Sequence, residues 1–328
     1  MLEHGGQISA AAARYGIPVA DWLDLSTGIN PVPFVPPPIH LDAWARLPQE
    51  QDGLPEAATG YYGTADLLPV AGSQAAIQAL PRLRAPSRVG VLHPGYAEHA
   101  HAWRSAGHEV VAVGAEEITA QLARLTVLVL MQPNNPTGST FSQEQLRDWH
   151  QRLAARGGWL IVDEAFIDAA AQASFAQPQM PPGLIVLRSL GKFFGLAGAR
   201  VGFVLAHPVL LAALRDMLGP WTVAGPARFV AQAALLDHTW QAATRERLLQ
   251  DGARLAQLLR AAGLPPVGGC GLFQWVSTEK AATIHRHLAQ RGILTRYFAQ
   301  PRSLRFGLPG SAAEWDRLDS ALAELNTK

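Results

Sequence analysis

The sequence is poor in lysine and cysteine and has no long apolar run. Only three of its 328 residues are lysines, Lys192, Lys280 and Lys328, and Cys270 is the single cysteine, so an intramolecular disulfide is excluded. No apolar stretch reaches the roughly 18 residues of a membrane-spanning helix. The N-terminus lacks the basic stretch and apolar core of a secretory signal. These absences predict a cytoplasmic protein with no membrane partner.

An excess of charge of one sign is also absent. The formal net charge is +1, with 48% hydrophobic and 16% charged residues. A balanced charge without basic runs gives no electrostatic reason to expect nucleic acid as a partner. The composition is that of a folded globular chain, and the length suggests one large and one small domain.

One of the few lysines stands in an unusual setting. Lys192 follows the apolar run 184–187 and is flanked by Gly191 and Phe193, whereas Lys280 and Lys328 are expected at the solvated surface. Arginine is used nearly everywhere else, and arginine cannot replace lysine where a neutral amine must attack a carbonyl, because its guanidinium stays protonated. The pattern therefore indicates a reactive amine at position 192.

Short apolar runs alternate with helical patterns from about residue 70 to 206. Ser142, with Gln145 three residues later, forms a capping box before one of the helices. This alternation predicts an α/β fold with a doubly wound, mostly parallel sheet, which binds ligands beyond the carboxyl ends of its strands. The predicted strands are 89–92, 110–113, 126–130, 159–162, 184–187 and 201–204, and the predicted helices are 73–83, 97–106 and 143–155.

The remainder of the chain reads as a smaller α+β domain. We expect an N-terminal arm, residues 1–40, associated with that domain, a large domain over 41–215 and a small C-terminal domain over 216–328. The proline-rich segment 31–38 is a rigid connection. After Pro208 the predicted helices are 208–218, 226–262 and 312–325, and the predicted strands are 273–276, 294–297 and 303–306.

Polar groups follow three of the predicted strands of the large domain. The segments are 132–138 (QPNNPTG), 163–166 (DEAF) and 188–192 (RSLGK), and Arg200 stands eight residues after the lysine. Because parallel strands deliver their carboxyl ends to one edge of a sheet, these groups can converge on one ligand.

This ordered set of motifs resembles the class I/II aminotransferase superfamily, whose members have the fold type I of pyridoxal-phosphate enzymes. The resemblance implies pyridoxal 5'-phosphate as cofactor and Lys192 as the catalytic amine, bound to it as a Schiff base. It also implies that Asp163 pairs with the ring nitrogen and that Asn135 binds the ring oxygen. The other cofactor-binding residues that it implies are Ser189 and Arg200 at the phosphate, Gly72, Ser73 and Gln74 at a helix start that completes the phosphate site, and Tyr96 stacked on the ring.

Two departures from the superfamily pattern stand out. Phe166 occupies a position where relatives often carry tyrosine. Leu47-Pro48-Gln49 is the nearest match to a segment that sends a tyrosine to the neighbouring subunit's cofactor, and Tyr61 or Tyr62 could substitute for it.

The N-terminal motifs Glu3-His4-Gly5-Gly6 and 24–31 (DLSTGINP) are similar to the threonine-phosphate decarboxylases of cobalamin synthesis. The resemblance implies decarboxylation of O-phospho-L-threonine to (R)-1-amino-2-propanol phosphate. It places His4, Gly28 and Asn30 near the substrate and Arg305 at its carboxylate. Arg296, Arg302 and His4 are the candidates for the substrate phosphate.

Two alternatives stay open at this point: an aminotransferase of the histidinol-phosphate type, and a non-catalytic protein that binds pyridoxal phosphate. The resemblance also implies a homodimer. The histidines at 93, 99, 101 and 108 have no carboxylate or cysteine at ligand spacing, so no metal site is expected.

Overall fold

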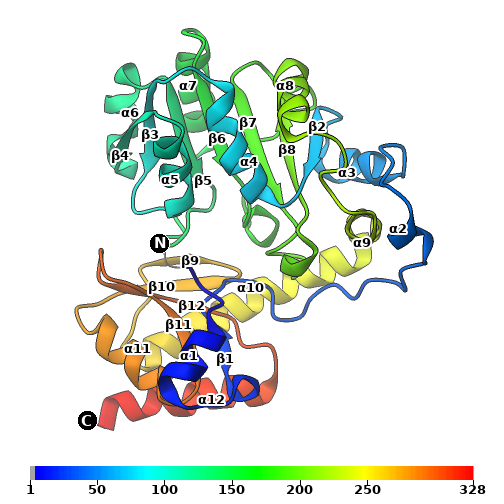
Figure 1. Cartoon of the computed structure of the whole chain (residues 1–328). Helices are drawn as coiled ribbons and strands as arrows, with labels where there is room; N and C mark the ends of the chain where they lie inside the picture. The colour runs from blue at the N-terminus through cyan, green and yellow to red at the C-terminus, as the bar shows by residue number, and fades with distance from the viewer. Residues whose placement is uncertain (1–3, 328) are drawn as a thin grey trace.

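The computed structural model describes residues 4–327, which form two lobes, each built around its own sheet (Figure 1). Glu3 of the N-terminal motif and Lys328 lie outside the described residues. The seven-stranded sheet of the larger lobe has the order β2-β8-β7-β6-β5-β3-β4. Its strands are β2 (Leu67–Val70), β3 (Arg88–Leu92), β4 (Glu109–Val113), β5 (Val127–Met131), β6 (Trp159–Asp163), β7 (Leu184–Ser189) and β8 (Gly202–Ala206).

Helices cover both faces of this sheet, as its buried strands require. Val127 and Val129 of β5 belong to one core cluster, whereas Leu128 and Leu130 belong to the other, because successive side chains of a strand point to opposite faces. The first cluster includes residues of α4, α5 and α8, and the second includes residues of α3 and α7. These helices are α3 (Leu54–Tyr62), α4 (Ser73–Ala79), α5 (Ala97–Ser105), α7 (Gln143–Ala154) and α8 (Pro208–Leu218), and the short α6 (Ile118–Gln121) precedes α7.

The doubly wound, mostly parallel sheet confirms the predicted fold class. All pairs from β4 to β7 are parallel, and β8 alone runs antiparallel to both of its neighbours. Strand β2 was not predicted, because it contains Pro69. A proline is tolerated there since β2 is the edge strand, where one side of the backbone needs no ladder partner.

The smaller lobe carries a five-stranded sheet of order β1-β11-β12-β10-β9. Its first strand comes from the N-terminal arm: β1 pairs in parallel with β11, with Leu23 opposite Ile293. The strands are β1 (Leu23–Leu25), β9 (Gly268–Cys270), β10 (Phe273–Ser277), β11 (Ile293–Phe298) and β12 (Ser303–Gly307), and the helices are α1 (Ile8–Tyr15), α11 (Ala281–Ala289) and α12 (Ala312–Ala323). The residue numbers of the domain boundaries stay predictions.

The predicted helix over 226–262 is wrong in one respect, since it is two helices, α9 (Gly225–Leu236) and α10 (His238–Ala261). Asp237 separates them and caps α10, its Oδ1 accepting a hydrogen bond from the Trp240 N–H at 2.9 Å. In Figure 1, α10 runs from the larger lobe into the smaller one. Within residues 4–327, no helix combines the length and apolar character needed to cross a bilayer.

Candidate active site

Two adjoining cavities lie at the carboxyl ends of the parallel strands. The inner cavity has a volume of about 150 Å³, and the outer cavity one of about 600 Å³. Tyr96, Asn135 and Lys192 line both, so these three side chains mark the boundary between them. All of the residues predicted to bind the cofactor line the inner cavity except Gly72. Of the predicted substrate residues, His4, Arg296 and Arg305 line the outer cavity.

Lys192 lies in the turn after β7, at the boundary of the two cavities. Its Nζ donates a hydrogen bond to the carbonyl oxygen of Thr27 at 3.4 Å and lies 5.3 Å from the centre of the Phe166 ring. Burial and the neighbouring Arg305 guanidinium lower the pKa of Lys192 to about 8. A lowered pKa leaves more of the amine neutral, which is the form that attacks a carbonyl.

Asp163, the last residue of β6, has a neighbour that the sequence did not reveal. Its Oδ2 is 2.9 Å from Nε2 of His99 on α5, and its Oδ1 accepts a hydrogen bond from the Ala165 N–H at 3.0 Å. Both side chains are nearly inaccessible, 2% and 3% exposed. The only sequence signal for His99 is its place one helical turn after Tyr96, which indicates a shared face of the helix.

Arg305 of β12 brings the smaller lobe to the boundary between the cavities. Its Nη1 donates to Oδ1 of Asn135 at 2.6 Å, and its Nη2 donates to the carbonyl oxygen of Ser26. Burial and the neighbouring Arg296 lower the pKa of Arg305 to about 10, so it stays a cation at neutral pH. Arg296 of β11 stands directly opposite Arg305 in the antiparallel pair of strands.

Ser73, Ser189 and Arg200 all line the inner cavity, although they come from three separate segments. Arg200 has the left-handed backbone of φ 53°, which is rare for a residue with a side chain. A side chain at Gly72 would collide with the Arg200 guanidinium, and a Cβ at Gly202 would lie 2.6 Å from the Ser73 backbone nitrogen. Glycine at both positions therefore leaves room for an anion next to Ser73 and Arg200.

The predicted substrate residues of the N-terminal arm divide into two groups. His4 lines the outer cavity, and its Nε2 lies 2.8 Å from Oε1 of Glu98. Gly28 lines neither cavity. It has φ 61°, and a Cβ there would lie 3.4 Å from the rings of Phe166 and Phe273 and 3.7 Å from the Arg305 guanidinium carbon, so it packs behind residues that do line the cavities.

The structure does not bring Asn30 to either cavity. Its Nδ2 donates to the carbonyl oxygen of Phe193 at 2.8 Å, and its backbone N–H donates to that of Lys192 at 3.0 Å. Its Oδ1 accepts from Arg247 Nη2 at 2.8 Å. With these groups engaged inside the protein, Asn30 supports the lysine turn instead of contacting a substrate.

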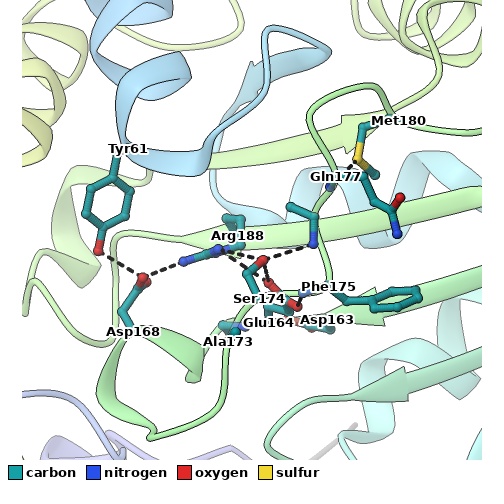
Figure 2. Close-up of polar contacts among 12 residues, drawn as sticks. Tyr61, Asp163, Glu164, Asp168, Ala173, Ser174, Phe175, Gln177, Met180 and Arg188 are labelled. Atoms are coloured by element: carbon teal, nitrogen blue, oxygen red, sulfur yellow. Dashed lines mark hydrogen bonds and ion pairs between the residues drawn. The ribbon is translucent and has the colours of Figure 1, made fainter. Parts of the chain in front are cut away.

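A buried ion-pair network lies behind the strand ends and was also missed (Figure 2). Arg188, which precedes Ser189, contacts Glu164 at 3.3 Å and pairs with Asp168. Ser174 Oγ donates to Glu164 at 2.6 Å, and the Tyr61 hydroxyl donates to Asp168 at 2.9 Å. Neighbouring carboxylates of Asp168 and Glu164 raise the pKa of Arg188 despite its burial.

Tyr61 and Tyr62, the candidates for replacing a cross-subunit tyrosine, both contact this network. The Tyr61 hydroxyl is bonded to Asp168 of its own chain, and Tyr62 is buried with its ring 4.6 Å from the Arg188 guanidinium carbon. Burial raises the pKa of both phenols. Tyr62 is thus part of the interior of its own chain, whereas Tyr61 is half-buried and bonded to Asp168. That either tyrosine substitutes for a cross-subunit tyrosine stays a prediction.

The chain belongs to the aminotransferase class I and II family, whose sequence model matches residues 48–322. Within the family it is 59% identical to the threonine-phosphate decarboxylase of Pseudomonas aeruginosa over 322 residues, which cover 98% of this chain and 97% of that relative. It is 44% identical to the threonine-phosphate decarboxylase of a Sinorhizobium species over 99% of this chain and 98% of the relative. The solved structure of histidinol-phosphate aminotransferase from Sinorhizobium meliloti in complex with pyridoxal-5'-phosphate is similar with a TM-score of 0.83, covering 99% of this chain and 95% of that chain, at 23% identity. The fold is fold type I of the pyridoxal-phosphate enzymes.

The donor set of the inner cavity fits that cofactor. The cavity is lined by an amine with a lowered pKa, by a buried carboxylate at the end of β6, and by two hydroxyls and a guanidinium. These are the groups expected to meet an aldehyde, a pyridine nitrogen and a phosphate, respectively. The glycine backbone at 72 and 202 leaves the space that the phosphate needs.

Proposed function

We propose that this protein is a carboxy-lyase that uses pyridoxal 5'-phosphate to decarboxylate O-phospho-L-threonine to (R)-1-amino-2-propanol phosphate, for cobalamin synthesis. The observation that carries the proposal is the pair Arg296–Arg305, two guanidiniums in register on neighbouring strands, both lining the outer cavity next to Lys192. Like charges placed directly opposite each other are unfavourable in a sheet. A substrate that carries both a carboxylate and a phosphate offers one anionic group to each guanidinium.

The residues of the inner cavity would hold the cofactor as follows. Lys192 binds its aldehyde, Ser73, Ser189 and Arg200 bind its phosphate, and Tyr96 packs on the ring. Asn135 donates to the ring oxygen while its own Oδ1 accepts from Arg305. When bound, pyridoxal phosphate supplies an electron sink for the electron pair of the bond that breaks.

Asp163 keeps the ring nitrogen protonated by accepting its hydrogen bond. The carboxylate can do so because its contacts with His99 and the Ala165 N–H hold it in place and leave it facing the inner cavity. A cationic ring is the better electron sink, so this contact would raise the rate of the step that the cofactor catalyses.

On the substrate side, Arg305 binds the α-carboxylate, and Arg296 and His4 bind the phosphate. Arg305 would orient the carboxylate for departure as carbon dioxide, and contacts that are stronger in the transition state than with the bound substrate would accelerate decarboxylation. The Nζ of Lys192, at the boundary of the cavities, can return a proton to the carbon from which carbon dioxide departs.

The test is turnover of O-phospho-L-threonine by the purified protein loaded with pyridoxal phosphate. Release of carbon dioxide and formation of the amino-alcohol phosphate without any 2-oxo acid supports the lyase. Turnover of histidinol phosphate that depends on a 2-oxo acid would support the alternative aminotransferase. Cofactor binding with no turnover in either assay would indicate a non-catalytic protein.

The assembly that we propose is a cytoplasmic homodimer. Large apolar side chains are exposed on and around α2 (Asp42–Ala45): Leu41 is 77%, Trp44 65% and Leu47 65% exposed. Trp221 is also exposed, by 58%, and has the left-handed φ of 58°, a backbone conformation that costs about 1–3 kcal/mol for such a residue. A second copy would bury the exposed apolar side chains around α2.

A further inference from the structure

Glu98 on α5 is a buried acid that none of the roles above uses. Only 9% of the residue is exposed, and it lines neither cavity. Its Oε2 accepts hydrogen bonds from Gln74 Nε2 at 2.9 Å and Gln78 Nε2 at 3.3 Å, both on α4. Its Oε1 lies 2.8 Å from His4 Nε2. Each oxygen of one carboxylate thus contacts a different part of the molecule.

Through Gln74, the Oε2 atom of Glu98 is linked to the inner cavity, and through His4, its Oε1 atom is linked to the N-terminal arm. Gln74 lines the inner cavity, and its Oε1 accepts a hydrogen bond from the Tyr96 hydroxyl at 3.4 Å. Burial and the Glu98 carboxylate raise the pKa of Tyr96 to about 12, so that hydroxyl remains a donor at neutral pH. His4 stands at the start of the arm and lines the outer cavity.

The arm is otherwise held to the smaller lobe. The Gly6 N–H donates to Ser26 Oγ at 2.7 Å, and the Gly5 backbone packs so closely on Ser26 that no Cβ would fit. At the start of the arm, the His4–Glu98 pair reaches across to the larger lobe. The pair therefore joins the two lobes beside the outer cavity, which His4 lines.

We propose that Glu98 is a positioning residue that fastens the N-terminal arm over the active site and couples this closure to occupation of the inner cavity. A buried carboxylate oxygen that loses its partner is penalised, so Glu98 favours the state in which His4 stays in place. The same carboxylate accepts a hydrogen bond from Gln74, which in turn contacts Tyr96. A cofactor that fixes Gln74 and Tyr96 in the inner cavity therefore also fixes the Glu98 carboxylate to which His4 binds. In the free protein the arm opens more often than in the cofactor-loaded protein.

The consequence for the substrate rests on the proposed function. With Nε2 held by Glu98, the His4 ring is fixed at the lining of the outer cavity. In its imidazolium form, which has an N–H on both ring nitrogens, His4 can also donate a hydrogen bond from Nδ1 to an anionic group of the substrate. Glu98 thus acts on substrate affinity through His4 and touches neither substrate nor cofactor.

The experiment compares Glu98→Gln with Glu109→Gln, a matched change at an exposed glutamate of β4 that pairs with Arg88 at 3.4 Å. Amide hydrogen exchange of residues 5–15 is measured with and without pyridoxal phosphate. We expect the cofactor to slow exchange of this segment in the wild type and in Glu109→Gln, and to have no such effect in Glu98→Gln. In turnover, we expect Glu98→Gln to raise KM for O-phospho-L-threonine about tenfold, which corresponds to ~1.4 kcal/mol, while kcat changes less than twofold.

Two results would overturn the proposal. One is arm exchange in Glu98→Gln that responds to the cofactor as in the wild type. The other is a fall in kcat at unchanged KM, which would mean that Glu98 acts on the cofactor and not on the arm. Glu98→Asp keeps the charge and should recover part of the KM effect, and His4→Ala replaces Glu98→Gln if circular dichroism shows that the latter is unfolded. A wild type that does not turn over the substrate refutes the proposed function, while the exchange experiment still decides the coupling.

Discussion

At the scale of single residues, the environment of Lys192 predicts a pH dependence. Burial, Arg305 and Arg200 disfavour the ammonium form, and only Asp163 opposes them. With a pKa of about 8, roughly a tenth of the amine is neutral at pH 7, against less than about one part in a thousand for an ordinary lysine. Cofactor uptake needs the neutral form, so its rate should rise with pH and level off above about 8. Rapid-mixing absorbance measurements on cofactor-free protein test this, with Lys192→Ala as the blank; a rate still rising steeply at pH 10 would contradict it.

His99 should matter to catalysis although it touches neither reactant. Replacing it by leucine leaves Oδ2 of Asp163 without its partner at 2.9 Å. The loss of one hydrogen bond to a buried charged group costs about 1–3 kcal/mol, so kcat should fall roughly 5- to 150-fold. His150→Leu, on the exposed side of α7, serves as the control and should keep its kcat. Equal kcat values for both variants would show that His99 does not contribute to catalysis.

The residues of the cavities differ in how well the sequence predicts them. Asn135, Asp163 and Lys192 each follow an apolar strand within a recognisable motif, and the structure brings them together at the inner cavity. Glu98 and His99 carry no motif, because their importance comes from partners far away in the chain. Such contacts follow from packing of helices on the sheet, which residue spacing alone does not determine.

At the scale of elements, the junction between β2 and α4 should be sensitive to one methyl group. Gly72 has φ 75°, and its missing side chain is what admits the Arg200 guanidinium. We expect Gly72→Ala to weaken pyridoxal phosphate binding at least tenfold, because the guanidinium must shift or the backbone is strained. Gly60→Ala on α3, where a Cβ meets no atom within 4 Å, is the matched control. Fluorescence titration with the cofactor distinguishes them, and equal affinities would show that Arg200 does not need this space.

The network of Figure 2 predicts a large effect on stability. Arg188→Met leaves Glu164 and Asp168 buried without their cation. Breaking a buried ion pair in this way costs about 3–5 kcal/mol. Arg152→Met removes an exposed pair with Asp148 on α7 and should cost only about 0.5 kcal/mol or less. Urea denaturation of both variants measures the difference, and a similar midpoint for both would mean that the carboxylates find other partners.

The elements that the sequence predicts best are the uninterrupted apolar strands. β5, β6 and β7 are buried over nearly their whole length and lie within one or two residues of the predicted ranges. β1, β2 and β9 were missed because they are three or four residues long and contain aspartate, proline or glycine. Short strands of this kind are stabilised by the sheet that they join and have little propensity of their own.

For the whole molecule, the exposed apolar surface around α2 predicts self-association. Light scattering should give a dimer, and Trp44→Asp should shift the equilibrium towards monomer by placing a charge in the interface. Val209→Asp, an equally solvent-facing apolar position on α8 with 73% exposure, is the control and should stay dimeric. A monomeric wild type at micromolar concentration would refute the proposed assembly.

The pairing of β1 with β11 has a consequence for synthesis on the ribosome. Leu23–Leu25 leave the exit tunnel early, yet the strand against which they hydrogen-bond, Ile293–Phe298, is translated near the end. The larger lobe can fold while translation continues, but the smaller sheet has to wait with one strand unpaired. Nascent chains stalled before residue 293 should therefore be cleaved by protease around Leu23–Leu25, and full-length chains should resist cleavage there.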